Sequence, residues 1–333
     1  LFMGVRLRCA NCHDHPLDRW TQDDYHGLAA IFARIEGGRV VRMREGGTVT
    51  HPRTGQDARQ RIPGTKFLEG QVDARQLLAR WLTSADNPYF ARAMSNRLWK
   101  AMMGRGLVEP TDDLRATNPA SHPGLMDELA ADFSRNNYDL RHTLRVIALS
   151  HSYRRSSRSL PANKADDRFY SHALVKQLDA EVLLDAISDV TGVVEAFPGT
   201  RENTRAIELV HAGIPSRALD VLGRCAREES CESVAPAATG GLARRLHWLN
   251  GSLVNGRITD PNGRLGMLVR DQMPTGKIID ELYQRCFSRG LDDLERKYWT
   301  DQLRGVDEAG ERRQLLEDLF WSILSSEEFL TNH

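Results

Sequence analysis

The densest group of chemically reactive side chains in this sequence is Cys9-Ala10-Asn11-Cys12-His13. Two thiols three positions apart, followed at once by an imidazole, form the pattern to which c-type haem is covalently attached. In that chemistry Cys9 and Cys12 form thioether bonds to the porphyrin, and His13 supplies the proximal nitrogen to iron. The spacing therefore predicts haem c at these three residues.

The same residues allow two other interpretations. Asp14-His15-Pro16 follows directly, so Cys9, Cys12, His13 and His15 are four metal-binding side chains within seven residues. Such a set suits zinc or iron without porphyrin, with Asp14 orienting an imidazole from outside. The third interpretation is structural, with a disulfide or two reduced thiols near a loop. The sequence leaves all three open.

The second axial ligand of a haem iron is not assigned by the sequence. His15 is too close in sequence to His13 to reach the opposite face of the ring, which leaves His26, Met43 and His51 as candidates. Met94 and Met102 lie in a helical stripe, where methionine is expected to pack in the core.

Composition excludes several classes of protein. The 45 basic and 45 acidic residues cancel, so we expect no nucleic-acid partner. No apolar run approaches the roughly 18 to 20 residues needed to span a bilayer.

Neither a dinucleotide fingerprint nor a phosphate loop is present, and whether the chain is an enzyme stays open. The first five residues lack the features of a signal peptide, so we expect a piece of a longer protein with any export signal upstream.

Helical periodicity dominates the chain and predicts a mainly α fold, a helix-rich multi-helical packing with a minor β-hairpin and loop region. Thr21 and Asp24 are expected to cap a helix directly after the cysteine motif. The apolar face expected for that helix is Tyr25, Leu28, Ala29 and Phe32.

Further helices are expected where apolar residues recur at helical spacing, around 87–103, 125–133, 139–147, 183–190, 242–249, 275–289, 291–303 and 312–329.

Two stretches interrupt the helical pattern. Residues 37–66 are rich in Gly, Pro and Thr and suit a short hairpin and loops, so we place a domain boundary near residue 66. Residues 201–241 read as a loop region with a short strand or two, in which Cys225 and Cys231 are close enough to pair.

Asp112, Asp113, Arg115 and His122 could form an acid-base or metal site, but adjacent carboxylates in a loop more often cap helices and pair with arginine. We therefore expect this group to be architectural.

Long motifs in the chain resemble two planctomycete-type domains. CANCHDHPLDRW (9–20) is similar to the end of the cytochrome-associated domain called PSCyt-two, and residues 78–123 resemble the PSD-one domain that follows it. Further similar stretches are 138–157, 172–193, 246–255 and 319–333. The resemblance implies that 1–66 is the C-terminal part of a PSCyt-type domain and that 67–333 is a helical PSD-type domain.

Both families are largely of unknown function, so the resemblance implies little chemistry. The cytochrome label reflects the Cys-x-x-Cys-His pattern itself. Relatives often carry an upstream cytochrome c domain and an export signal, which implies a periplasm or cell-envelope location and a redox partner protein or upstream cytochrome domain as partner. Ser233 stands where the family continues with arginine after Cys231-Glu232, so no role is carried over to Cys231.

Three hypotheses of function follow. The leading one is a c-type haem-binding electron-transfer module of a cell-envelope protein. The second is a metal-dependent enzyme with a Cys/His site and a carboxylate such as Asp113 handling protons. The third is a non-catalytic scaffold or surface-binding module.

Overall fold

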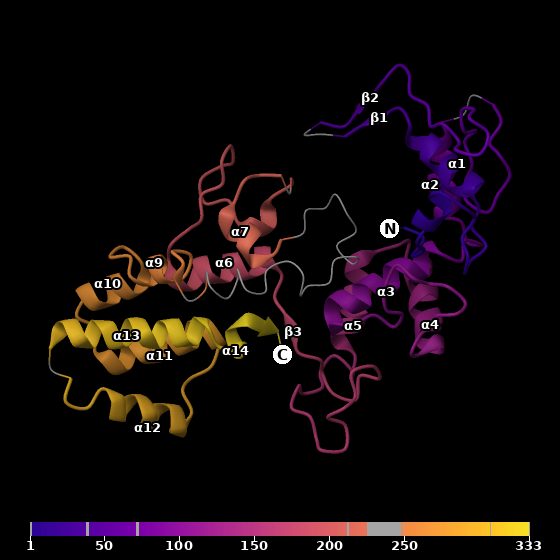
Figure 1. Cartoon of the computed structure of the whole chain (residues 1–333). Coiled ribbons are helices and arrows are strands. Elements are labelled where there is room, and N and C mark those ends of the chain that lie inside the picture. The colour runs from indigo at the N-terminus through magenta and orange to yellow at the C-terminus, as the bar shows by residue number, and fades with distance from the viewer. Residues whose placement is uncertain are drawn as a thin grey trace. The chain divides into compact units, whose positions relative to one another are not determined.

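Two compact units make up the chain, residues 1–174 and 175–333, and each is described by itself (Figure 1). The computed structural model describes residues 2–37, 40–70, 73–211, 213–224, 248, 250–306 and 308–332. The division at residue 174 is one of backbone contacts. The boundary expected near residue 66 concerns the two family-like domains and stays a prediction.

Helices and one small hairpin build the first unit. In chain order its elements are η1 (Arg8–Asn11), α1 (Gln22–Phe32), β1 (Ile35–Glu36), β2 (Arg42–Met43), α2 (Ala74–Leu82), α3 (Phe90–Met103), α4 (Pro123–Arg135) and α5 (Leu140–Leu149). Strands β1 and β2 are antiparallel, with Ile35 opposite Met43. Helix α3 packs against α4 and α5 (Figure 1).

Helix α3 ends where the spacing predicts, but it begins three residues later than expected, at Phe90 with Tyr89 as its N-cap. The side-chain oxygen of Asn87 accepts the backbone N–H groups of Tyr89 and Phe90, so it caps the first turn. Gly104 ends the helix in the left-handed region at φ +83°, which glycine adopts without the strain of a Cβ. Trp99 and Met103 face the core of the unit, together with Met126 of α4.

The second unit is a larger helical assembly. In chain order its elements are β3 (Lys176–Gln177), α6 (Ala180–Thr191), η2 (Ala206–Glu208), α7 (Arg217–Leu222), α9 (Asn255–Ile258), α10 (Arg264–Arg270), α11 (Thr275–Phe287), α12 (Asp293–Gln302), α13 (Ala309–Leu324), α14 (Glu327–Leu330) and β4 (Thr331–Asn332). Strands β3 and β4 pair antiparallel.

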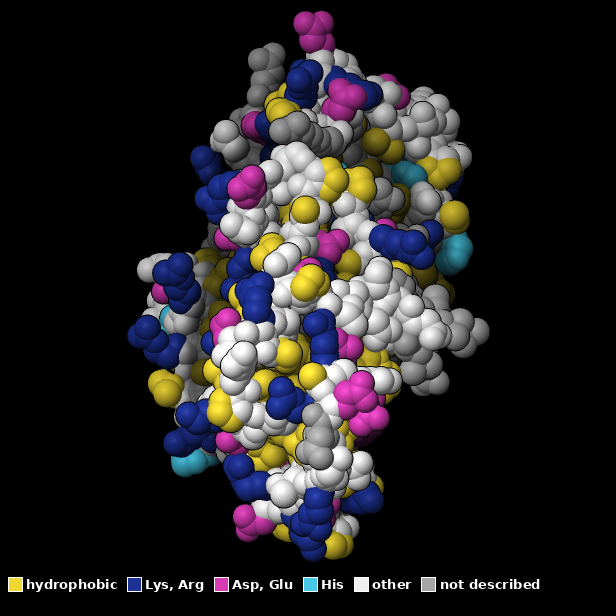
Figure 2. All heavy atoms as spheres, turned by 90° about the vertical axis from the view of Figure 1, so that its left-hand side faces the viewer, with side chains coloured by type: hydrophobic (Ala, Val, Ile, Leu, Met, Phe, Trp, Pro, Cys, Tyr) yellow, Lys and Arg dark blue, Asp and Glu magenta, His cyan; other side chains and the backbone are white. Residues whose placement is uncertain are grey.

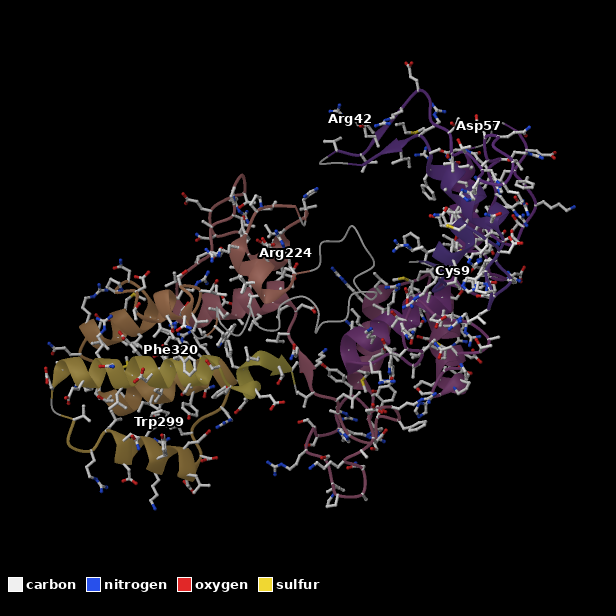
Figure 3. All side chains as sticks on the ribbon, in the orientation of Figure 1. Cys9, Arg42, Asp57, Arg224, Trp299 and Phe320 are labelled. Atoms are coloured by element: carbon white, nitrogen blue, oxygen red, sulfur yellow. The ribbon has the colours of Figure 1, made fainter. Side chains whose placement is uncertain are left out.

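Leucine and phenylalanine from several helices form the core of the second unit. Leu183 and Ile187 of α6 are fully buried, as their spacing predicts. Phe320 of α13 is also fully buried, at the position labelled in Figure 3, and Leu282 of α11 belongs to the same cluster. These side chains remove a continuous apolar surface from water.

Three expectations about where helices lie and end were wrong. Helix α11 ends at Phe287, before the expected residue 289, and its C-terminal cap Ser288 adopts a left-handed φ of +56°. The expected helix 312–329 is divided into α13 and α14, because the hydroxyl of Ser326 caps a new turn. The helix α7 lies in a region expected to contain loops and strands. The helix expected over 242–249 and the pairing of Cys225 with Cys231 fall almost entirely outside the described residues.

The mainly α prediction is confirmed, since the described strands form only two small two-stranded sheets. None of the described helices is long and apolar enough to cross a membrane. Basic and acidic side chains are interspersed over the face shown in Figure 2, as expected for a chain with no net charge.

A matched pair of leucine variants tests the core of the second unit. Leu282→Ala removes a fully buried side chain, and we expect it to lower the free energy of unfolding by about 2–5 kcal/mol. Leu294→Ala, at a site that is 80% exposed on α12, should change it by less than about 0.5 kcal/mol. Urea denaturation followed by circular dichroism measures both. Equal effects would contradict this packing.

Candidate functional site

The two motif cysteines lie on one tight turn. Cys9 is within η1 and Cys12 is its C-terminal cap, and both thiols are free and exposed (Figure 3). Ala10 between them is fully buried in an apolar cluster with Met3 and Trp20. The alternation of a buried methyl group with two exposed thiols fixes which side of the turn faces solvent.

Helix α1 holds the backbone of this turn. The side-chain amide of Gln22 donates to the carbonyl oxygen of Cys12 at 2.7 Å, and the Nε2–H of His26 donates to that of Asn11 at 3.0 Å. The backbone N–H of Gln22 donates to the Asp14 carboxylate at 2.9 Å. The side chains of Gln22 and His26 are buried, so these bonds satisfy donor groups that would otherwise be costly to bury.

The first turn of α1 is fixed by the expected capping box. Thr21 accepts the backbone N–H of Asp24 through its hydroxyl, and the Asp24 carboxylate accepts the backbone N–H of Thr21 at 2.9 Å. Asp24 is buried, and its other oxygen accepts the N–H of Gly64 at 2.8 Å and pairs with Arg61 at 3.2 Å. The helix that holds the motif is therefore tied to the loop before α2.

The two motif histidines have different hydrogen-bond partners. Nδ1 of His13 lies 2.8 Å from the carbonyl oxygen of Asp14. A carbonyl oxygen only accepts, so Nδ1 carries the proton, and the neutral ring keeps a lone pair at Nε2 for a metal. Nδ1 of His15 instead accepts the N–H of Leu17 at 3.2 Å, which leaves the proton of the neutral ring at Nε2. His15 therefore offers no lone pair to a metal in this arrangement.

The four possible ligands of a bare ion are not brought together. Among the residues that the structure describes, no group of three or more His, Cys, Asp or Glu side chains is arranged to hold a metal ion. Cys9, Cys12, His13 and His15 thus do not form the tetrahedron that structural zinc requires.

The donor set does fit covalent haem. Attachment needs two free thiols on one turn and one imidazole with an available nitrogen. The thiols are those of Cys9 and Cys12, and the imidazole is that of His13. Unlike the ligands of a bare ion, these three groups do not have to meet at one point. Leu17, which is 66% exposed, adds an apolar side chain close to the motif in sequence.

The candidates for a second axial ligand are distributed differently. His26 and His51 are both buried, with ring centroids 5.0 Å apart, and Nε2 of His51 lies 3.1 Å from the Asp23 carboxylate. Met43 is exposed on β2. None of these positions assigns the ligand, and all three stay predictions.

The acidic pair of the second family-like segment is engaged by arginines. Arg115 donates to both oxygens of Asp113, and Arg6 pairs with Asp112 at 2.8 Å. The ring of His122 instead lies beside Tyr170 and contacts the Ser121 hydroxyl. The expected pairing with arginine is present. The Asp112 and Asp113 carboxylates bind arginine side chains and not the ends of helices.

Gln22 and His26 were missed as parts of the site. They stand four residues apart on α1, so they share one face of the helix and point at the preceding turn. Two polar residues at that spacing on the buried side of a helix, directly after a Cys-x-x-Cys-His motif, are the signal that could have identified them.

Two family models match the chain. The family described as PSD1, protein of unknown function (DUF1553), matches residues 74–303. The family described as PSCyt2, protein of unknown function (DUF1549), matches residues 1–37, which include the cysteine motif. No curated protein matches the chain, and no solved structure matches it.

Thiol reactivity tests the exposure of the motif. Burial raises the pKa of the Cys286 thiol to about 12, whereas Cys9 and Cys12 are exposed. Only thiolate reacts with iodoacetamide, so Cys9 and Cys12 should be alkylated well before Cys286 near pH 8. Peptide mass spectrometry of timed samples measures this, with urea-unfolded protein as control. Early labelling of Cys286 in the folded chain would contradict the burial assigned to it.

The hold of α1 on the motif is tested at Gln22. Gln22→Leu keeps the size of the side chain but removes the donor for the Cys12 carbonyl, and we expect a loss of about 1–3 kcal/mol in unfolding free energy. Gln76→Leu, on the exposed side of α2, is the matched control and should have little effect. Hydrogen exchange around residues 9–14 should rise only in the first variant, and unchanged exchange there would refute the contact.

Proposed function

The chain belongs to the PSD1 family of proteins of unknown function, and its residues 1–37 match PSCyt2. We propose that it is a c-type haem-binding electron-transfer module of a cell-envelope protein. In this proposal Cys9 and Cys12 form the thioether bonds and His13 is the proximal ligand. Bound there, haem supplies a one-electron redox couple. The partner is a redox protein or an upstream cytochrome domain in the periplasm or envelope.

The observation that carries the proposal is the contrast between the two histidines of the motif. The Asp14 carbonyl orients His13 with Nε2 available, and a proximal haem ligand needs that nitrogen. The ring of His15 is held the other way by Leu17. Covalent haem attachment uses the histidine directly after the second cysteine, His13, and does not use His15. The hydrogen bonds of the two rings favour the same assignment.

The same contrast argues against the metal-dependent enzyme. A bare zinc or iron at this motif needs His15 or another ligand to complete its shell. Asp113, the carboxylate considered for proton transfer, already accepts hydrogen bonds from Nε and one terminal nitrogen of the Arg115 guanidinium. The chain's own residues thus support attachment and orientation of a group at His13 more than acid-base chemistry.

In the proposed module, the residues around the motif orient the ligands and limit their movement. Gln22 and His26 fix the turn that carries both cysteines, and Asp14 fixes the His13 ring. The buried Ala10 anchors the turn in the apolar cluster.

The test is production of the full chain in a periplasmic host with the haem-attachment machinery. We expect haem to stay with the polypeptide after denaturation and to give a sharp Soret band. Cys12→Ser should leave a single thioether, visible in the pyridine haemochrome spectrum, and His13→Ala should alter the axial-ligand spectrum. His15→Ala, the matched control, should behave as the unmodified chain.

Other outcomes separate the competing functions. Stoichiometric zinc or iron without porphyrin, lost in both histidine variants, would favour the metal-dependent enzyme. Neither haem nor metal would favour a scaffold. An unchanged covalent-haem spectrum in Cys12→Ser would refute the role given to that sulfur.

A further inference from the structure

The hairpin of β1 and β2 exposes large apolar side chains that the described parts of the chain leave uncovered. Val40 is 61% exposed, Val41 69% and Met43 53%. Figure 1 shows this hairpin projecting beyond α1 and α2. Three large apolar side chains within four residues, all more than half exposed, are unusual on a soluble surface and mark a place of contact.

The hairpin has two different faces. Side chains alternate along a strand, so Met43 and Ile35, which stand opposite each other in the register, lie on one face of the ribbon. Arg42 lies on the other face, opposite Glu36, and Arg44 pairs with Glu36 at 2.7 Å. One face is therefore apolar and the other is charged.

The described part of the hairpin carries a net charge of +1. The described residues from 34 to 45 carry three arginines, at positions 34, 42 and 44, against the two glutamates at positions 36 and 45. Figure 3 labels Arg42 on this hairpin. Because the whole chain has no net charge, this local excess is what would attract an anionic partner.

We propose that the hairpin binds the surface of a bilayer that contains anionic lipids. Val40, Val41 and Met43 insert at the boundary between headgroups and acyl chains, and Arg42 contacts lipid phosphate. This proposal does not depend on haem.

The size of the patch favours lipid over a protein partner. A stable protein interface takes about 800 Å² from each partner and needs complementary shape. Three side chains at the end of a two-stranded ribbon offer much less, whereas the interior of a bilayer accepts apolar side chains without shape matching. The two-residue strands are also too short to pair with an added strand over a useful length.

The test is sedimentation of the full chain with vesicles of phosphatidylcholine, with and without phosphatidylglycerol. We expect binding to the anionic vesicles that weakens as salt is raised. Val41→Asp should lower the partition coefficient about tenfold or more, since it removes an apolar contact and adds a repelled charge. Val210→Asp, the same change at a site 92% exposed in the second unit, is the matched control and should not affect it.

Arg42→Gln separates the electrostatic contribution and should reduce the preference for anionic vesicles. Equal binding to neutral and anionic vesicles, no binding to either, or equal loss in the two valine variants would overturn the proposal. Thermal unfolding of Val41→Asp provides a further check. An early transition would show that the chain itself covers this face, and it would also overturn the proposal.

Discussion

The motif turn depends on the hydrogen bonds that Gln22 and His26 make to its carbonyl groups. These side chains can reach the turn only because the capping box at Thr21 and Asp24 fixes where α1 begins. A shift of one residue in that start would rotate both donors by about 100° around the helix axis. The presentation of both thiols therefore follows from the first turn of one helix.

The segment that carries the motif is also bound to the helices that follow it in the first unit. The Arg19 side chain donates to the hydroxyl of Tyr89 and lies over its ring, and the backbone N–H of Leu114 donates to the carbonyl oxygen of Gly4. Together with the pair of Arg6 and Asp112, these contacts join residues matched by PSCyt2 to residues matched by PSD1. In the first unit the two family segments share one packed structure.

The sequence predicted most of the helices, because their apolar spacing and caps are local signals. It failed on the orientation of α1. Phe32 was expected on the buried face but is 43% exposed, while Gln22, Asp24 and His26 are buried. Periodicity assumes that a buried face is apolar, and this face instead has to bind a polar turn. The sequence also could not predict which ring nitrogen carries the proton in His13 and in His15. That choice depends on the backbone atoms of Asp14 and Leu17 that the two rings contact.

The buried Ala10 has a consequence for any group that binds at this turn. Its methyl group and the bonds from α1 hold residues 9–12 in one conformation before a ligand arrives. The conformational entropy of that turn is therefore lost during folding and not during binding. The two cysteines therefore stand on a stretch of backbone that folding has already ordered.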